Sequence, residues 1–190
     1  MSFVLNPQLP PAPKPCSRVA RIGAIVSDSG AEKQALLMQF AARRRDEGLR
    51  IAGIIEIAAP DHGSDCGALD VLDLATGARI SISQDLGPGS TACNLDPGGV
   101  AMACAAAQRA IEAGADVVVL SKFGKLEAGH GGLCDAFAAA MAAETPVLTT
   151  LKPLMREDWA HFAETLSDEL PPSLDALETW WRRLAQRNAA

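Results

Sequence analysis

Residues 115–127 read ADVVVLSKFGKLE, and they join a continuous apolar run to a loop that carries two lysines. The run from Val117 to Leu120 does not alternate polar and apolar residues, which is typical of a strand buried on both faces of a parallel sheet. Lys122 follows the strand directly, and Gly124 and Lys125 come shortly after it. The stretch therefore predicts a buried strand that presents two lysines to an anionic group. A solvated loop whose lysines bind nothing fits the same letters.

The rest of the chain alternates between strand-like and helix-like segments. Two alternating runs on either side of Ala75 to Gly77 predict a β-hairpin. Strands are expected at residues 19–26, 51–57, 69–74, 79–83, 117–120 and 147–150, and helices at residues 30–48, 97–114 and 133–142, with two more helical stretches at the end. This order predicts a three-layer α/β fold with a mainly parallel sheet and a β-hairpin insertion.

Length and composition predict one globular domain behind a proline-rich arm. A chain of 190 residues with 48% hydrophobic residues can bury one core and is short for two. Five prolines that disfavour helix and sheet lie near the start, at positions 7, 10, 11, 13 and 15. We therefore expect a flexible arm over residues 1–17 and a single α/β domain over residues 18–190.

Charge and composition argue against several partners. A net charge of −6 and the absence of tyrosine give no basic or base-stacking surface, so nucleic acid is not an expected partner. No run approaches the roughly 18 apolar residues of a membrane span, and the start lacks a signal-peptide pattern, so we expect a cytoplasmic protein without membrane insertion. The five cysteines show no paired spacing, which indicates reduced thiols.

Residues 27–34 read SDSGAEKQ and admit two interpretations. A phosphate-binding loop needs glycines to wrap the phosphates, a lysine to reach them and a hydroxyl residue for the metal. Lys33 stands at the lysine position and Ser29 and Gly30 at the helix start, but Gln34 replaces the hydroxyl residue. Alternatively, Ser29 and the glutamate three residues later form a capping box, which stabilises a helix by about 1 kcal/mol without any ligand.

The opening strand, loop and helix, the hairpin and the SKFGKLE stretch together resemble the small nucleoside-triphosphatases of the P-loop superfamily. Their second-site motif has the form Asp-Glu-hydrophobic-Gly-Lys-hydrophobic-Glu, which Gly124, Lys125 and Glu127 match. Ser121 and Lys122 stand where those enzymes have the Asp that holds Mg²⁺ and the Glu that orients water. The resemblance therefore implies a P-loop NTPase-like fold whose catalytic motifs are degenerate.

More closely, residues 20–170 resemble an uncharacterised bacterial family related to that fold. The motifs that carry this resemblance lie at residues 73–77, 83–87, 93–96 and 122–127. Members of that family resemble accessory proteins that accompany molybdate uptake or molybdenum enzymes. The resemblance implies a small anionic ligand, either a nucleotide with Mg²⁺ or molybdate or another oxyanion.

Further candidate residues lie in loops. Gln84 and Asp85 end a predicted strand, where they either contact a ligand or form a hydrogen-bonded turn. Cys66 and Cys93 form a candidate thiol site, although unpaired cysteines are more often inert. A zinc site would require two loops to meet and to bring together His62, Cys66, His130 and Cys134. These intervals differ from common zinc patterns, so we predict no metal site.

Three functions fit these observations. The preferred one is a degenerate P-loop NTPase-like protein that binds a nucleotide or small oxyanion in an accessory or regulatory role. In it, Lys33, Lys122 and Lys125 supply charge, while Gly30 and Gly124 allow close backbone approach.

Two alternatives remain. An active Mg²⁺-dependent nucleoside-triphosphatase would use Asp28 or Asp85 in place of the missing strand aspartate. A non-catalytic homodimer would form through an apolar stripe on the last helix, which otherwise packs against its own domain. That stripe consists of Leu174, Leu177, Trp181 and Leu184.

Overall fold

A computed structural model of the chain describes residues 22–58, 69–84 and 95–188. The predicted arm over residues 1–17 lies outside the described residues. Seven strands form one sheet in the order β4-β3-β2-β5-β6-β1-β7. Their bounds are β1 (Ile22–Val26), β2 (Ile51–Ala58), β3 (Leu69–Asp73), β4 (Arg79–Ser81), β5 (Val117–Leu120), β6 (Val147–Leu151) and β7 (Ser167–Leu170).

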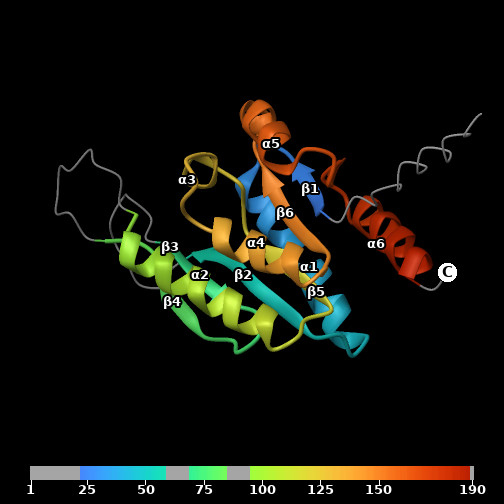
Figure 1. Cartoon of the computed structure of the whole chain (residues 1–190), viewed down its shortest axis with the longest axis horizontal. Coiled ribbons are helices and arrows are strands. Elements are labelled where there is room, and N and C mark those ends of the chain that lie inside the picture. Colours follow the sequence, from blue (N-terminus) through green and yellow to red (C-terminus); the bar gives the residue numbers. More distant parts are fainter. Residues whose placement is uncertain (1–21, 59–68, 85–94, 189–190) are drawn as a thin grey trace, which may run out of the picture.

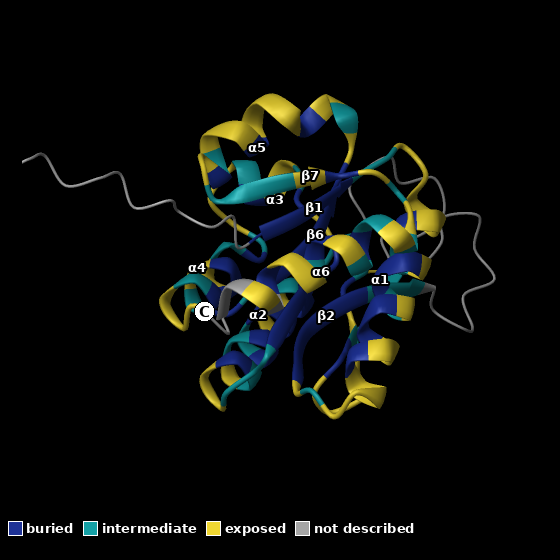
Figure 2. Cartoon of the chain, turned by 90° about the vertical axis from the view of Figure 1, so that its right-hand side faces the viewer, coloured by how far each residue is buried: buried dark blue, intermediate teal, exposed yellow. Residues whose placement is uncertain are grey.

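Helices cover both faces of the sheet, which confirms the three-layer α/β fold (Figure 1). One face packs against α1 (Gly30–Asp46) and α6 (Leu174–Asn188). The other packs against α2 (Pro97–Glu112), α4 (Cys134–Ala142) and α5 (Arg156–Ala163). Two short elements, α3 (Lys125–Ala128) and the 3₁₀ helix η1 (Pro153–Met155), follow β5 and β6. Figure 2 shows buried residues along the strands and exposed residues on the outer sides of the helices.

The expected central strand is β5, and all four of its residues are fully buried. Val118 and Leu120 belong to the core under α2 and α4, whereas Val117 and Val119 belong to the core under α1. Burying a valine or leucine side chain contributes roughly 1.5–3 kcal/mol, so both faces of this strand stabilise the sheet. The neighbouring β2 has Gly53 opposite Val119, and a Cβ there would lie 1.9 Å from the Val119 carbonyl oxygen. The β2–β5 pairing therefore requires glycine at this position.

The antiparallel part of the sheet is the expected hairpin. β3 pairs antiparallel with β2 and with β4, while β2, β5, β6, β1 and β7 run parallel. The parallel strands therefore end at one common edge, the carboxyl edge. The strand order around β1 and β5 is consistent with a P-loop NTPase-like fold.

The last strand was missed by the sequence pattern, whereas the last helix was expected. β7 reads SDEL and was not predicted as a strand; it lies at the edge, where only Leu170 is buried. The stripe on α6 packs against its own domain, with Leu177 and Leu184 buried and Trp180 more deeply buried than Trp181. Intramolecular packing of this stripe is thereby confirmed. Within the described ranges, no helix is long and apolar enough to cross a bilayer.

Candidate functional site

Three loops meet at the carboxyl edge, after β1, β5 and β6. The Ser27 amide donates to the Leu151 carbonyl oxygen at 3.3 Å, which joins the first loop to the end of β6. The Phe123 amide donates to the Thr150 carbonyl oxygen at 2.7 Å, and the Thr150 hydroxyl donates to the Ser121 carbonyl oxygen at 2.8 Å. These bonds fix the loops relative to one another, so side chains from three strand ends share one site.

The first loop is short and satisfies most of its own polar groups. Ser29 caps α1, because its hydroxyl accepts from the Glu32 amide at 3.3 Å. The Ser29 amide donates to the Ser27 hydroxyl, which in turn donates to the Glu32 carboxylate. The serine half of the predicted capping box is therefore confirmed. In the other half, the Ser29 amide donates to the Ser27 hydroxyl and not to the Glu32 carboxylate that a capping box would use. Gly30 begins the helix, and a Cβ on it would meet no atom within 4 Å.

Lys33 points into the protein rather than toward solvent. Its residue is 4% exposed, and its ammonium donates to the carbonyl oxygens of Ser27 and of Leu151, the latter at 3.1 Å. Burial lowers the pKa of Lys33, and the positive charge of Lys152 lowers it further. Asp28 and Glu56 act in the opposite direction. Lys33 thus links the ends of β1 and β6 as a buried cation.

Gln34 occupies the position at which a P-loop has its hydroxyl residue. Its Nε2 donates to the Ser121 carbonyl oxygen at 3.1 Å, so α1 is tied to the end of β5. The Oε1 atom of Gln34 is buried and has no hydrogen-bond partner within the described part of the chain. The amide side chain therefore connects the two motif positions directly and leaves one buried acceptor unused.

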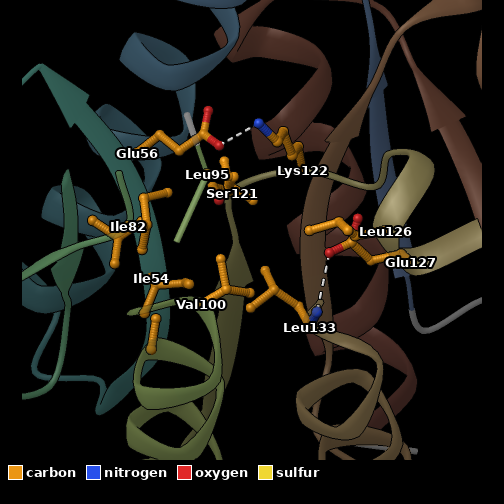
Figure 3. Close-up of a pocket in the computed structure, with 12 residues that line it drawn as sticks. Ile54, Glu56, Ile82, Leu95, Val100, Ser121, Lys122, Leu126, Glu127 and Leu133 are labelled. Carbon is orange, nitrogen blue, oxygen red and sulfur yellow. Dashed lines mark hydrogen bonds and ion pairs between the residues drawn. The ribbon is translucent and has the colours of Figure 1, made fainter. Parts of the chain in front are cut away.

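The two lysines of the second loop differ from Lys33 in exposure. Lys122 is 47% exposed and forms an ion pair with Glu56 of β2, whose side chain is 16% exposed (Figure 3). Lys125 is exposed at the start of α3, and among the described residues its ammonium has no ion-pair or hydrogen-bond partner. Lys125 does not pair with Glu127, because the Glu127 carboxylate is buried and accepts from two backbone amides.

Glu127 holds the second loop together. It is 4% exposed, and its carboxylate accepts from the Gly124 amide at 2.9 Å and from the Leu133 amide at 3.0 Å. A Cβ at Gly132 would lie 2.1 Å from the Glu127 Oε1, so this arrangement also requires a glycine with φ +59°. Gly124 therefore contributes its amide to an internal carboxylate. The sequence showed Glu127 as a motif match without revealing this structural role.

Lys152 is a cation of the site that the sequence analysis missed. It is exposed and follows β6 directly, one residue after the carbonyl that receives Lys33. Its charge is the second-largest cause of the lowered pKa of Lys33, which places the two ammonium groups within electrostatic range. The signal that could have found it is positional: a lysine directly after a buried parallel strand, as with Lys122.

The remaining candidates are only partly placed. Gln84 donates to the Leu95 carbonyl oxygen at 3.0 Å, whereas Asp85, Cys66, Cys93 and His62 lie outside the described residues. Asp96 caps α2 by accepting from the amides of Gly98 and Gly99. Within the described ranges no group of three or more His, Cys, Asp or Glu residues could hold a metal ion.

Two of the cysteines lie in the described part of the chain. Cys104 of α2 is buried, and Cys134 of α4 donates to the Glu127 carbonyl oxygen at 3.3 Å. Burial, with Glu127 and Asp135 nearby, raises the pKa of Cys134 to about 11, and burial also raises the pKa of Cys104. Both thiols stay protonated near neutral pH, so neither has the character of a reactive nucleophile. His130, the other described member of the considered zinc set, is exposed.

Comparison with known proteins adds two matches. A family model described as protein of unknown function (DUF2478) matches residues 22–180. The chain is also 38% identical over 168 residues to a Bradyrhizobium diazoefficiens protein named Molybdenum import ATP-binding protein ModC 2. The match covers 88% of this chain but 19% of that relative. No solved structure matches the chain.

Proposed function

The chain belongs to the family of unknown function DUF2478, and from that premise we propose that it binds a small inorganic oxyanion of the molybdate type at the carboxyl edge. In this proposal it acts as an accessory protein of molybdenum uptake or use, and it does not hydrolyse nucleotides efficiently.

The convergence of lysines from three strand ends carries this proposal. Lys33, Lys122 and Lys152 follow β1, β5 and β6, and the charges of the latter two act on Lys33. Lys122 and Lys152 are exposed, so their ammonium groups can turn toward a bound dianion. Lys125 lies at the same edge without a partner among the described residues. Ammonium groups bind tetrahedral oxyanions as point charges, which suits an edge with several lysines.

The first loop supports a compact anion better than a polyphosphate. The amides of Ser29, Glu32 and Lys33 already donate within the loop or the first helical turn. A polyphosphate cradle needs such amides to be free. Asp28 and Glu32 add negative charge beside it, and the carboxylate that would hold Mg²⁺ after β5 is replaced by Ser121. These features favour a single small anion held by lysines.

The molybdenum-related relative supports the choice of oxyanion. The name of that relative concerns molybdenum import and ATP binding, and about four-fifths of that protein lies outside the match. We assign the matched part to the oxyanion rather than to ATP, because the degenerate motifs of this chain lie within it. An accessory role follows from the same reasoning.

Isothermal titration of the purified chain tests the proposal. We expect sodium molybdate and tungstate to bind more tightly than sulfate or phosphate, and Mg²⁺-ATP to bind weakly and release no phosphate. The double variant Lys122→Gln/Lys152→Gln should weaken molybdate binding at least about ten-fold, which is about 1.4 kcal/mol. Arg109→Gln is the matched control, because Arg109 is exposed in the last turn of α2, whose other end lies at the carboxyl edge.

Two results would contradict the proposal. Absence of heat and of a thermal shift with every oxyanion would remove it. Mg²⁺-dependent phosphate release that Asp28→Asn abolishes would instead establish the nucleoside-triphosphatase alternative.

A further inference from the structure

A cavity lies beside the lysine site, between the carboxyl ends of β2 and β5 and the start of α2 (Figure 3). It is partly open, and its empty volume of about 370 Å³ includes open solvent. Its walls are mostly apolar and include Ile54, Val71, Ile82, Val100, Ala103 and Leu133. Five of these six side chains are buried core positions, all except Val100, so the walls are held by the fold itself.

One end of this cavity carries the side chain of Ser121. Ser121 is 2% exposed and lines the cavity. Its carbonyl oxygen accepts two hydrogen bonds, but its hydroxyl makes none with the described residues. Because this hydroxyl lines the cavity, a ligand that accepts from it would take the place of water.

The cavity is lined by one lysine, Lys122, and by two carboxylates, Glu56 and Glu127. The Glu127 carboxylate already accepts from two amides of its own loop, so Lys122 is the charged group that a ligand can engage. Lys122 and Glu56 line the cavity next to Ser121, and they form the ion pair described above. The ammonium of Lys122 is the more exposed partner, and a half-exposed pair of this kind contributes at most about 1 kcal/mol, so a ligand can replace Glu56. Lys33 and Lys152 add positive charge to the same edge.

We propose that this cavity binds a small organic anion. A short aliphatic or aromatic body would fill the apolar part, and its anionic head would accept from the Ser121 hydroxyl and the Lys122 ammonium. Such a division between apolar walls and a few polar groups is typical of small-molecule sites. The proposal goes beyond inorganic oxyanion binding and shares only Lys122 with that site.

A methyl NMR titration of the full chain with hexanoate tests this proposal, with 1-hexanol as the neutral molecule of equal length. We expect hexanoate to shift the methyl signals of Ile54, Val71 and Val100 with a dissociation constant of about 1 mM, as ligands of this size bind weakly. Hexanol should bind at least about five-fold more weakly, because it lacks the negative charge that the Lys122 ammonium attracts. Equal binding of the two molecules would overturn the proposal.

Variants separate the cavity from the rest of the surface. Ser121→Ala and Lys122→Gln should each weaken hexanoate binding by about three-fold to ten-fold while the chain stays folded. Val100→Phe should fill the cavity and remove binding, whereas Met102→Phe, at a position that is 64% exposed on the same helix, should leave it unchanged. If the two phenylalanine variants behave alike, or if no cavity methyl shifts at about 20 mM hexanoate, the proposal is wrong.

The same samples distinguish this proposal from the proposed function. Molybdate binding without hexanoate binding would reject the cavity and leave the oxyanion site standing. Hexanoate binding without molybdate binding would do the reverse.

Discussion

The two loops that leave β1 and β5 begin alike and use their lysines in opposite ways. Lys33 lies in the interior, where carbonyl oxygens of the chain surround its ammonium. Lys122 and Lys125 lie outside, one beside a carboxylate and one without a partner among the described residues. In the second loop the buried charge is Glu127, which accepts two amides. Each of the two regions thus has one buried charged residue that stabilises the fold, Lys33 in the first and Glu127 in the second. Only the second also has exposed lysines that can bind a ligand.

The largest effect should come from removing the buried cation of the first loop. Lys33→Met keeps the apolar stem but leaves the carbonyl oxygens of Ser27 and Leu151 without this donor. We expect a loss of about 2–4 kcal/mol in the free energy of unfolding, measured by urea denaturation. A loss below about 0.5 kcal/mol, as expected for exposed sites, would show that Lys33 is not structural and would break the comparison.

The buried carboxylate of the second loop should come next. Glu127→Gln preserves one acceptor oxygen but places an NH₂ group against an amide, either that of Gly124 or that of Leu133. We expect the free energy of unfolding to fall by about 1–3 kcal/mol in the same urea experiment. Asp135→Asn, in the first turn of the adjacent α4, serves as control and should change stability by less than about 0.5 kcal/mol. Equal losses in both variants would contradict the role of Glu127.

Cys134, which contacts the Glu127 carbonyl, should make stability fall at alkaline pH. Its folded-state pKa of about 11 lies above the value of 9.0 for a free thiol, so the unfolded chain releases this proton first. The stabilisation is complete below pH 9 and is lost as pH rises from 9 toward 11. After allowance for solvent at this partly exposed site, the loss should stay below about 1 kcal/mol at pH 10.

The difference between the wild type and Cys134→Ala isolates this contribution, because other titrating groups cancel between the two proteins. The stability gap measured at pH 7.5, 9 and 10 should narrow with rising pH. A gap that stays constant would show that burial does not protect this thiol.

The smallest effect on stability should come from the exposed lysines. Lys122→Ala removes a half-exposed ion pair, and Lys125→Ala removes no described contact, so each should change the free energy of unfolding by less than about 0.5 kcal/mol. The same variants should weaken anion binding in the titration described above. If they unfold the protein instead, the second loop is as structural as the first, and the comparison loses its contrast.

Much of the fold could be predicted because its signals are local. The uninterrupted apolar run at residues 117–120 and the turn between two alternating strands each report directly on burial and pairing. β7 could not be predicted in this way, since SDEL contains one apolar residue and becomes a strand only by pairing with β1. Its strand state depends on long-range pairing rather than on local preference.

The sequence predicted where the site lies in the chain, but not how its side chains are arranged. Chain order showed that Lys33 and Lys122 follow buried strands, but it did not show that one ammonium turns inward and the other outward. Those directions depend on partners distant in sequence, such as the Leu151 carbonyl, 118 positions beyond Lys33, and Glu56 on the neighbouring strand. The cavity is likewise lined by residues from several separate elements, so no single sequence motif predicts it.

The pairing between Ser83 and Leu95 offers a place at which another protein domain can be inserted into the chain. Ser83 and Leu95 form an isolated bridge, and Gln84 Nε2 holds the Leu95 carbonyl oxygen, so the fold itself keeps these two positions together. Doubling the number of residues between two such fixed points costs only about 0.6 kcal/mol of closure entropy. A fluorescent reporter that replaced residues 85–94 would be joined to the domain at Gln84 and Leu95, and Leu95 lines the cavity. The protein could in this way be turned into an optical sensor for whatever enters that space.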